Sequence, residues 1–558
     1  MAGSAARAAD RAARTATIDE TDRGEELRMS TLRFQPEAAR FYAEGHWRSG
    51  DLWEDFAERA AARPRSTALV LDDRAVTYAE LRRAALAFSA RLAAAGVQPG
   101  DVVVLLGRHS IEAAVAVLGG LHRGAVLAPL PPMFNATQVE AVSRQAGARA
   151  IVAFGGDREI ATCEHVAQHV DALITLRADT LDALLTEDAP DDRAARHADD
   201  VAVVIHSSGT TSEPKGIVHS SNTLRYATEG LCRRWRLSAD DTYLVVSEFG
   251  FVGGLVFGYL PVLLTGGTGV LASRWDAEDA LRLIEQHRCT YVLLMPTHGA
   301  DTLRAAEATD RDLSSMRVLA APGLTPERRL AMREAFGVPP LADYGLSEVP
   351  GHTAHELDES EPKVVASEGR PYDGTEIRIL GADDAPLPAG TVGAVVVNGP
   401  SRFLSFLGND DLTRASLTSW GGYRTGDLGY LDEDGHLVYV GRSKDIIRRG
   451  GVTVVPAELE PVLLRHPAVH DAAVVPLPDE RLGERACAAL VIKPGRRAPT
   501  LAELQAFLEA EGVAKYTWPE SIQVFDDFPR TPSLKVVKRE VVRQIVERGA
   551  VPAGASAR

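Results

Sequence analysis

The sequence predicts an α/β protein with parallel sheets that is divided into more than one domain. Short apolar runs with the character of buried strands alternate with helical stretches, as they do in βαβ units. The chain has 558 residues, which is more than one hydrophobic core normally holds. After about residue 372 the predicted strands follow one another closely, which indicates a smaller, antiparallel part.

Helices and strands can be placed individually in the N-terminal half. Thr77 and Glu80 form a capping-box pattern at the start of a helix that extends to about Ala95, and Gly96 ends it. Helix-like segments separate several short apolar runs, which we expect to be parallel strands. These runs are Asp101–Leu106, Ala125–Leu130, Ala150–Phe154, Val201–Ile205, Tyr291–Met295 and Arg317–Ala320.

Changes of composition mark the remaining parts of the chain. The acidic, polar segment Thr186–Asp200 is interpreted as a surface linker between two α/β halves. Residues beyond about 445 are expected to form a last α+β part, and the tail Gly549–Arg558 is expected to be loose. The closely spaced strands of the antiparallel part are Glu376–Leu380, Gly393–Asn398 and His436–Val440.

Neither a signal peptide nor a membrane span is predicted. Residues 1–28 are rich in Ala and Arg but have no apolar core, so we expect a disordered extension, with Met29 as an alternative start. The most apolar stretch, Leu255–Ala272, contains Pro261 and four glycines. A buried helix followed by a strand is therefore favoured over a transmembrane segment.

Charge and cysteine content narrow the class of function. The formal net charge is −16, and a chain of this sign would be repelled by a nucleic-acid backbone. The four cysteines stand singly, without the spacing of a zinc site or a disulfide framework. A reducing, cytoplasmic compartment is the simplest interpretation, and no nucleic-acid partner is expected.

The strongest chemical motif is His206–Gly216, with the sequence HSSGTTSEPKG, directly after the predicted strand Val201–Ile205. Glycine and small hydroxyl residues let backbone N–H groups approach phosphate oxygens, and Lys215 adds a positive charge. The spacing differs from a Walker loop, and a flexible surface loop is the alternative interpretation. The candidate phosphate-binding residues are Ser207, Ser208, Gly209, Thr210, Thr211 and Lys215.

This motif resembles the phosphate loop of the adenylate-forming superfamily, which includes acyl- and aryl-CoA synthetases, firefly luciferase and the adenylation domains of peptide synthetases. In the usual pattern, S-S/T-G-T-T-G-x-P-K-G, Ser212 stands where Gly is common and Glu213 stands at the variable position. The similarity extends from about residue 35 to 545, with further motifs in the family order. It implies a large N-terminal domain of two parallel-type αβαβα sheets with a small β-barrel-like subdomain, and a small mobile α+β C-terminal domain.

The resemblance also implies where the domains end. An N-terminal adenylation domain that holds the ATP and substrate site is expected over residues 29–443, a mobile domain over 444–545 and a tail over 546–558. Lys444 matches the hinge position inside the motif Gly441–Gly451, GRSKDIIRRGG. Gly450 and Gly451 would line a narrow channel for pantetheine, since glycine lets a backbone approach a slender ligand.

A second family motif is matched by DYGLSE at residues 343–348. The resemblance implies that Tyr344 stacks on adenine and that Asp343 accepts a hydrogen bond from its amino group. Ser347, where the family usually has Thr, would bind the α-phosphate. Glu348 would hold Mg²⁺, because a carboxylate beside a triphosphate needs a divalent cation between them. A turn with a helix cap is the alternative. The adenine-binding residues implied are Asp343, Tyr344 and Gly345.

Two more residues complete the expected nucleotide site. Asp427, in the motif YRTGDLG at Tyr423–Gly429, would accept hydrogen bonds from both ribose hydroxyls. Arg442 would contact ribose and phosphate. Taken singly, such an Asp is usually a turn residue and such an Arg is usually solvated, so the two residues gain weight from their place in the series of motifs.

The segment Pro529–Lys535, PRTPSLK, matches the last family motif, with Leu534 where Gly is common. It would supply Lys535 to the first half-reaction, in which a carboxylate attacks the α-phosphorus of ATP and pyrophosphate leaves. A thiol then attacks the acyl-adenylate and expels AMP. The alternative is that this lysine is one of several exposed cations. The catalytic residues implied are Lys535, Glu348, Ser347 and Lys215.

Within the superfamily the chain is most similar to short- and medium-chain acyl-CoA synthetases and to cyclohexanecarboxylate-CoA ligases. RRGG at residues 448–451 and the segments Asp479–Val491 and Val513–Glu520 carry this similarity. It implies ATP, Mg²⁺ and coenzyme A as cofactors and a small carboxylic acid as substrate. A stand-alone enzyme that loads a carrier protein is the alternative, and a non-catalytic nucleotide-binding homologue is a remote one. The oligomeric state stays open, with a homodimer as one option.

The acyl pocket is expected from Glu248–Gly258, EFGFVGGLVFG, and from the loop Ala320–Pro326. Aromatic side chains with neighbouring glycines favour a small pocket, and ordinary helix core is the alternative. If buried, the carboxylate of Glu248 would need a partner and would bind a hydroxyl or amine of the substrate; if exposed, it would be solvated or salt-bridged. The candidate pocket residues are Glu248, Phe249, Phe251, Gly253 and Gly323.

Overall fold

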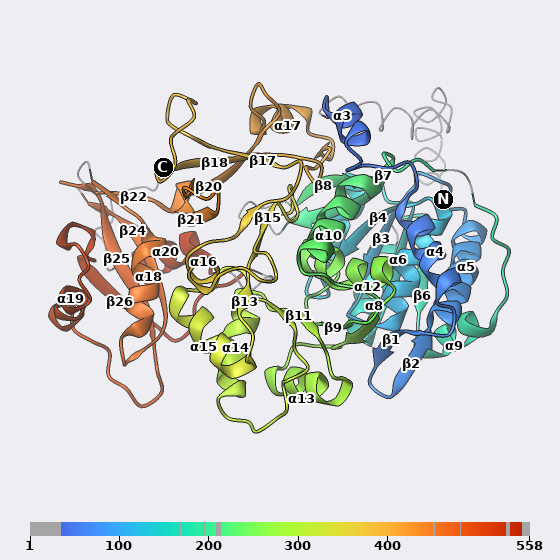
Figure 1. Cartoon of the computed structure of the whole chain (residues 1–558), viewed down its shortest axis with the longest axis horizontal. Coiled ribbons are helices and arrows are strands. Elements are labelled where there is room, and N and C mark those ends of the chain that lie inside the picture. Colours follow the sequence, from blue (N-terminus) through green and yellow to red (C-terminus); the bar gives the residue numbers. More distant parts are fainter. Residues whose placement is uncertain are drawn as a thin grey trace, which may run out of the picture.

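A computed structural model describes residues 35–167, 170–193, 196–207, 214–449, 452–479, 481–531 and 536–549. The extension expected at residues 1–28 lies outside these ranges, as do residues 550–558 of the expected tail. The first helices and the C-terminal part lie at opposite ends of the molecule, and the two large sheets lie toward the N-terminal end (Figure 1).

The first sheet has seven strands in the order β19-β8-β7-β4-β3-β5-β6. Five consecutive strands, β7, β4, β3, β5 and β6, are parallel. Strands β8 and β19 are added in antiparallel orientation at the edge beside β7. Every residue of β3, β4 and β5 is buried, because helices cover both faces. The bounds are β3 Val102–Leu106, β4 Val126–Leu130, β5 Ala150–Phe154, β6 Ala172–Leu176, β7 Val201–Ser207, β8 Lys215–Ser220 and β19 Ser405–Phe406.

The second sheet also has seven strands, in the order β13-β12-β11-β9-β10-β1-β2. Its neighbours are parallel, except that β2 forms an antiparallel hairpin with β1. The N-terminal hairpin thus completes a sheet whose other strands come much later in the chain. The bounds are β1 Thr67–Leu71, β2 Arg74–Thr77, β9 Thr242–Val245, β10 Thr268–Leu271, β11 Tyr291–Leu293, β12 Val318–Ala320 and β13 Pro340–Leu341.

Helices between the sheets and outside them complete five layers. Helices α4, α5, α6, α9, α10 and α12 contribute buried side chains to the core that both sheets share. Helices α7 and α8 cover the outer face of the first sheet, and α13, α14 and α15 cover that of the second. The predicted αβαβα arrangement is confirmed. The bounds are α3 Ala38–Ala43, α4 Leu52–Ala62, α5 Tyr78–Ala94, α6 Ile111–Arg123, α7 Ala136–Ala146, α8 Asp157–Val166, α9 Ala178–Thr186, α10 Ser221–Arg234, α12 Leu260–Thr265, α13 Ala277–His287, α14 Pro296–Ala306 and α15 Pro326–Phe336.

The local sequence patterns account for several element boundaries. The capping box between Thr77 and Glu80 is formed at the start of α5, and Gly96 follows the helix with a φ of +83°. The stretch Leu255–Ala272 is, as predicted, a buried helical segment followed by a strand. It consists of a π-helical turn at Leu255–Tyr259 and α12, and then β10.

The interpretation of Thr186–Asp200 as a linker between two α/β halves is wrong. The segment joins α9 to β7, and β7 belongs to the same sheet as β3 to β6. Its charged side chains bind the helical layer, since Asp191 lies 2.9 Å from His122 and Arg193 is paired with Asp51 at 2.5 Å. Composition reveals a polar surface segment but cannot tell which strands it separates, because strand order is set by long-range pairing.

Two antiparallel sheets follow the second large sheet. A three-stranded sheet, β14-β15-β16, leads to a four-stranded sheet in the order β17-β18-β20-β21. The predicted antiparallel part is therefore confirmed; among the described residues no pairing joins β17 to β21, so this sheet is open and not a closed barrel. The bounds are β14 Asp343–Tyr344, β15 Thr353–Ala354, α16 Glu361–Ala366, β16 Arg370–Pro371, β17 Glu376–Leu380, β18 Gly393–Asn398, α17 Asp410–Ser416, β20 Tyr423–Leu431 and β21 Leu437–Arg442.

The C-terminal part is a smaller α+β unit with a five-stranded sheet and its own hydrophobic core. It lies at the far end of the molecule from the first helices (Figure 1). In this arrangement Arg465 of α18 is paired with Glu327 of α15 at 2.6 Å. The bounds are β22 Ile447–Arg449, β23 Val452–Val454, α18 Pro456–Arg465, β24 Val469–Asp479, β25 Gly483–Ile492, α19 Leu501–Ala510, β26 Ser521–Phe525 and α20 Lys538–Glu547.

Among the helices that the structure describes, none combines the length and the apolar character that a bilayer crossing requires.

One crowded glycine fixes how the two small antiparallel sheets join each other. Gly369 has a φ of +80°, and a Cβ there would lie 2.0 Å from the backbone carbon of Ala354. Its carbonyl accepts from the N–H of Leu437 at 2.8 Å, which links β16 to the β20–β21 hairpin. We predict that Gly369→Ala lowers the free energy of unfolding by more than about 3 kcal/mol, because strain and a backbone clash combine.

Gly435 offers a matched control for this variant. Its φ is +81°, but a Cβ there would meet nothing within 4 Å, so Gly435→Ala should cost only about 1–2 kcal/mol of backbone strain. Urea unfolding followed by tryptophan fluorescence measures both variants. Equal losses would show that crowding at Gly369 does not contribute.

Candidate active site

The carboxyl ends of neighbouring parallel strands place several loops at one edge of the second sheet. Strands β9, β11, β12 and β13 are successive neighbours, so the segments that follow them leave the sheet at the same edge, where open α/β sheets bind their ligands. The segment after β9 also meets the first sheet. A Cβ on Gly250 would lie 2.3 Å from the nitrogen of Pro131, directly after β4, and the rings of Phe249 and Phe154 are 5.4 Å apart.

Asp343 lies on β14, directly beyond the end of β13, and is 6% exposed. Its Oδ1 accepts a hydrogen bond from the hydroxyl of Tyr372 at 3.1 Å. Burial raises the pKa of Asp343 to about 7, and the hydrogen bond opposes this only in part. The carboxyl group is thus held ready to accept one more hydrogen bond in a site from which water is largely removed.

Tyr344, Asp427 and Arg442 form one connected group. The Tyr344 hydroxyl donates to Oδ2 of Asp427, and Nε of Arg442 lies 2.7 Å from Oδ1 of the same carboxylate. The Asp427 side chain is 1% exposed, so the guanidinium supplies the charge that a buried carboxylate requires. The structure therefore brings together three motif residues that are far apart in the sequence, although both Asp427 oxygens are engaged within the protein.

Glu348 lies four residues beyond Tyr344 and is half-buried. Burial raises its pKa, while a hydrogen bond from the Tyr423 hydroxyl and the charges of Arg442 and Lys215 oppose this shift. A carboxylate oxygen is a ligand that Mg²⁺ prefers, and a divalent cation would remove the cost of the buried charge. The residue therefore fits the magnesium-binding role that its motif implies.

The backbone of the same motif is fixed by a histidine and a glycine contact. His219 on β8 contacts the carbonyl of Ser347, with Nε2 at 2.8 Å, and burial lowers the pKa of His219 to about 4. At Gly345, a Cβ would lie 2.5 Å from the nitrogen of Gly351, so this position has no room for a side chain. These contacts place Ser347 and Glu348 beside the β7–β8 hairpin.

The phosphate loop joins the two strands of that hairpin. Strand β7 ends at Ser207, which pairs with Lys215 at the start of β8. Ser208, Gly209, Thr210 and Thr211 lie outside the described residues. The Lys215 ammonium lies 5.9 Å from the centre of the Phe406 ring, and its charge acts on Glu348. One end of the loop is therefore placed beside the magnesium-binding candidate.

The predicted hinge and C-terminal residues are only partly described. Lys444 is exposed in a short 3-10 turn, Ser443–Asp445, between β21 and β22. The Ser443 hydroxyl donates to the carbonyl of Gly426 at 3.0 Å. Gly450, Gly451 and Lys535 lie outside the described residues, so their assigned roles stay predictions.

The candidate acyl-pocket residues follow β9 and β12. Phe249 is 1% exposed and belongs to the shared core, whereas Glu248, Phe251 and Gly253 are half-buried and Gly323 is exposed. A Cβ on Gly253 would come no closer than 3.7 Å to the sulfur of Met295. These residues lie in loops that leave the second sheet at the same edge, and Phe249 is packed in the core beside those loops.

Comparison with known proteins decides the family. The model of the AMP-binding enzymes matches residues 56–407, and that of the AMP-binding enzyme C-terminal domain matches residues 458–535. The chain belongs to the AMP-binding enzymes. It is 30% identical to a medium-chain fatty-acid–CoA ligase of Escherichia coli, over 93% of this chain and 94% of that protein.

Two further relatives show the range of this adenylate-forming family. The enzyme is 34% identical to a salicyl-AMP ligase / salicyl-S-ArCP synthetase of Mycobacterium tuberculosis, over 91% of this chain and 93% of the relative. Its structure matches ATP-bound MatB from Rhodopseudomonas palustris with a TM-score of 0.82 and 25% identity, covering 89% of this chain and 99% of MatB. Relatives with this fold thus act as acyl-CoA ligases or as carrier-protein synthetases.

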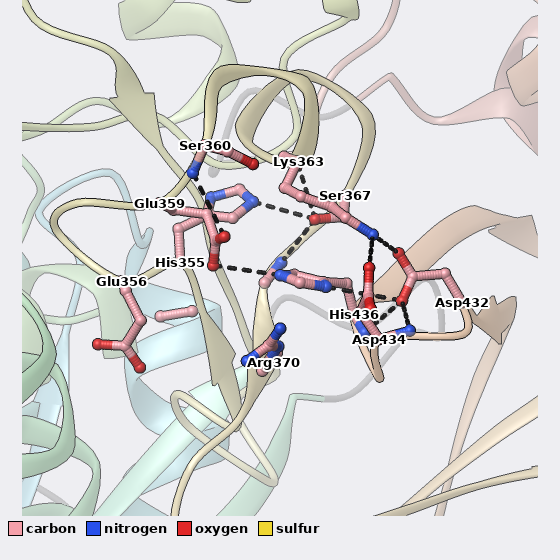
Figure 2. Close-up of polar contacts among 12 residues, drawn as sticks. His355, Glu356, Glu359, Ser360, Lys363, Ser367, Arg370, Asp432, Asp434 and His436 are labelled. Carbon is pink, nitrogen blue, oxygen red and sulfur yellow. Dashed lines mark hydrogen bonds and ion pairs between the residues drawn. The ribbon is translucent and has the colours of Figure 1, made fainter.

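A second ionisable cluster of this AMP-binding enzyme is structural. Asp432, Asp434 and His436 in the β20–β21 turn have ligand atoms within 4.8 Å of one another. However, the ammonium of Lys363 on α16 lies 2.7 Å from Asp432 and 2.5 Å from Asp434 (Figure 2). His436 contacts Glu359 at 3.1 Å. Because Lys363 already supplies the positive charge, the cluster ties α16 to the hairpin and is not assigned a metal.

Three residues that position the site were not predicted from the sequence. Tyr372 binds Asp343, Tyr423 binds Glu348 and His219 contacts the Ser347 carbonyl. Tyr423 was available as the first residue of the motif YRTGDLG. Tyr372 and His219 belong to other segments, and no pattern in the sequence connects them with the residues they contact.

The buried carboxyl of Asp343 leads to a prediction about pH. Its pKa is raised from 3.8 to about 7, so between these values the folded enzyme holds a proton that the unfolded chain has released. Stability from this group is therefore present at low pH and is lost as pH rises from about 4 to 7. Asp343→Asn keeps an acceptor for Tyr372 but cannot ionise.

We predict that Asp343→Asn is stabilised relative to wild type at pH 8, by at most about 4 kcal/mol, and that this difference vanishes near pH 4. Urea unfolding of both proteins across this pH range measures it. The raised pKa of Glu248 gives a slope of the same sign but is present in both proteins and cancels. A difference in unfolding free energy between the two proteins that does not change with pH would contradict the raised pKa of Asp343.

Proposed function

We propose that this enzyme uses ATP to convert a small carboxylic acid into an acyl-adenylate and then transfers the acyl group to the thiol of coenzyme A, releasing AMP. The acid would be a short or medium aliphatic, alicyclic or aromatic one. The observation that carries the proposal is the convergence of Asp343, Tyr344, Glu348, Asp427 and Arg442 in one connected site, with Lys215 beside it.

The chain's own residues would share the work as follows. Asp343 and Tyr344 would hold adenine, Asp427 and Arg442 the ribose, and Ser347 with the loop from Ser207 the phosphates. Bound to Glu348, Mg²⁺ would neutralise charge on the triphosphate. Groups that stabilise developing negative charge contribute most when they are fixed in advance, and the contacts of Tyr423 and His219 supply this fixation for Glu348 and Ser347.

The C-terminal part would supply the remaining groups. We propose that residues 444–545 turn about Lys444 between two poses, as a domain separate from residues 29–443. In one pose Lys535 would contact the phosphates, and in the other Gly450 and Gly451 would line the pantetheine channel. The exposed position of Lys444 between two strands supports a hinge there.

Transfer to a carrier protein is the second candidate. It is favoured by the 34% identity to the salicyl-AMP ligase / salicyl-S-ArCP synthetase of Mycobacterium tuberculosis, and the 30% identity to a medium-chain fatty-acid–CoA ligase favours coenzyme A. AMP release that requires only free coenzyme A supports the first candidate. Acyl transfer that requires a partner holo-carrier protein supports the second.

Acid-dependent exchange of pyrophosphate into ATP tests the first half-reaction. With Mg²⁺ and a panel of aliphatic, alicyclic and aromatic acids, we predict exchange that Glu348→Gln lowers by about 10²–10³-fold. Glu359→Gln is the matched control, because Glu359 belongs to the structural cluster of Figure 2, and it should stay within a few-fold of wild type. No exchange with any acid would favour the non-catalytic alternative and overturn the proposal.

The two-pose proposal makes a separate prediction for Lys535. Lys535→Ala should slow adenylate formation by about 10²-fold or more, yet leave the conversion of preformed acyl-AMP by coenzyme A largely intact. Lys538→Ala is the control, since this neighbouring lysine is paired with Glu460 at 2.6 Å. If both half-reactions fell equally in the Lys535 variant, a single fixed pose would explain the result better.

A further inference from the structure

Buried polar atoms without hydrogen-bond partners gather beside the candidate acyl pocket. Among the described residues they include Nε2 of His109, Oγ of Ser247, Oε2 of Glu248 and Nδ1 of His298. These residues come from three segments, which follow β3, β9 and β11. Leaving such an atom unpaired costs about 1–3 kcal/mol, so a local group of them indicates a missing partner.

The closest of these atoms face each other across a gap of defined width. Nε2 of His109 lies 3.9 Å from Oε2 of Glu248, and the histidine side chain is 1% exposed. This separation is too long for a direct hydrogen bond. A donor group placed between the two side chains could bind Oε2 of Glu248.

The surroundings of His109 indicate which kind of group is missing. The Tyr259 hydroxyl donates to the carbonyl of Ser110 at 3.4 Å and lies 3.2 Å from Nδ1 of His109. The ring also forms a hydrogen bond with the backbone of Ser247, which acts to raise its pKa, so the ring donates to that carbonyl. Burial lowers the pKa of His109 to about 4, so the ring is neutral. The single N–H of the neutral ring is therefore engaged within the protein, and the carboxylate oxygen Oε2 of Glu248 is the acceptor that faces the gap.

Neighbouring charges do not fill the gap. Arg108 is paired with the buried Glu159 at 3.1 Å and acts on Glu248 only at longer range, while the backbone N–H of His109 donates to the Glu248 carboxylate. Burial still raises the pKa of Glu248 to about 7. His298 stacks on Trp275 at 4.2 Å, and its pKa is also lowered to about 4 by burial. Among the described residues, no Lys or Arg therefore forms an ion pair with Glu248.

The position of this gap connects it with the acid substrate. Glu248 is four-fifths buried, with 20% of its side chain exposed, and it begins the loop after β9 that carries Phe251 and Gly253. A Cβ on Gly254 would lie 2.1 Å from the Glu248 carbonyl oxygen. The backbone of Gly254 therefore packs closely against that of Glu248 and restricts its position. The same sheet edge carries Asp343 three strands further on, directly after β13.

We propose that Glu248, which lies beside His109, binds a hydrogen-bond donor, an amine or a hydroxyl, on the part of the acid remote from its carboxylate. The inference rests on the proposed adenylation function and names the substrate class within it: substituted acids rather than plain hydrocarbon acids. An ordered water is the competing occupant of the gap. A site that hydrogen-bonds a substituent discriminates strongly against the analogue that lacks it, because its own polar groups are then left unpaired.

Matched acids test the proposal with the wild-type enzyme. Pyrophosphate exchange is measured with benzoate, hydroxybenzoates and aminobenzoates, and with hexanoate and its ω-hydroxy and ω-amino derivatives. At least one substituted acid should exceed its parent by about tenfold or more in kcat/KM. If every parent acid is preferred, water occupies the gap and the proposal is overturned. If no acid supports exchange, the adenylation function itself fails.

Variants of Glu248 then test whether this residue causes the preference for substituted acids and whether it favours an amine over a hydroxyl. Glu248→Leu should reduce the preference for the substituted acid at least about tenfold, mainly through KM. Glu248→Gln should impair amine-bearing acids more than hydroxyl-bearing ones, since it keeps an acceptor but loses the charge. Glu159→Gln is the matched control, because Glu159 is a neighbouring buried carboxylate that is already paired with Arg108. Its substrate preference should stay as in wild type.

An ATP-induced rise in melting temperature equal to that of wild type verifies that each variant is folded. Equal changes of preference in Glu248→Leu and Glu159→Gln would overturn the assignment, since they would indicate a general disturbance of the loop. An unchanged preference in Glu248→Leu would overturn it as well.

Discussion

The arrangement of the site depends on the pairing of one buried carboxylate with two partners. Asp427 on β20 accepts from Tyr344, which follows the second parallel sheet, and is ion-paired with Arg442 at the end of β21. A carboxylate that is 1% exposed would be strongly destabilised without its cation. The pairing therefore holds the antiparallel sheet, the edge of the second parallel sheet and the start of the segment after β21 in a fixed relation.

Several carboxyl groups at the ligand-binding edge of the second sheet are buried. Burial raises the pKa of Asp343, Glu348 and Glu248 above the ordinary values, and few cations lie near enough to oppose it. Such groups gain most from a ligand that brings a positive charge or a hydrogen-bond donor. The proposed ligands, which are the amino group of adenine, a magnesium ion and a substituted acid, would meet this need at Asp343, Glu348 and Glu248.

The interleaving of the two large sheets explains why loops from distant parts of the chain meet. The first sheet contributes the segments after β3, β4 and β7, and the second contributes those after β9, β11 and β13. His109 and Glu248 face each other only because these two edges meet. The wrong interpretation of Thr186–Asp200 as a linker has the same origin. A polar segment between two strands has the same composition whether those strands belong to two sheets or to one.

The sequence by itself determined the α/β class, the capping box of α5, most strands and the family motifs, because these depend on residues that are close in the chain. It also indicated that the carboxylate of Glu248, if buried, would need a partner. Tertiary structure alone decided that Tyr372 binds Asp343, that Tyr423 binds Glu348 and that the Glu248 carboxylate lies 3.9 Å from His109. Such contacts join side chains from separate elements, and their distances follow from how sheets and helices pack, which no local pattern encodes.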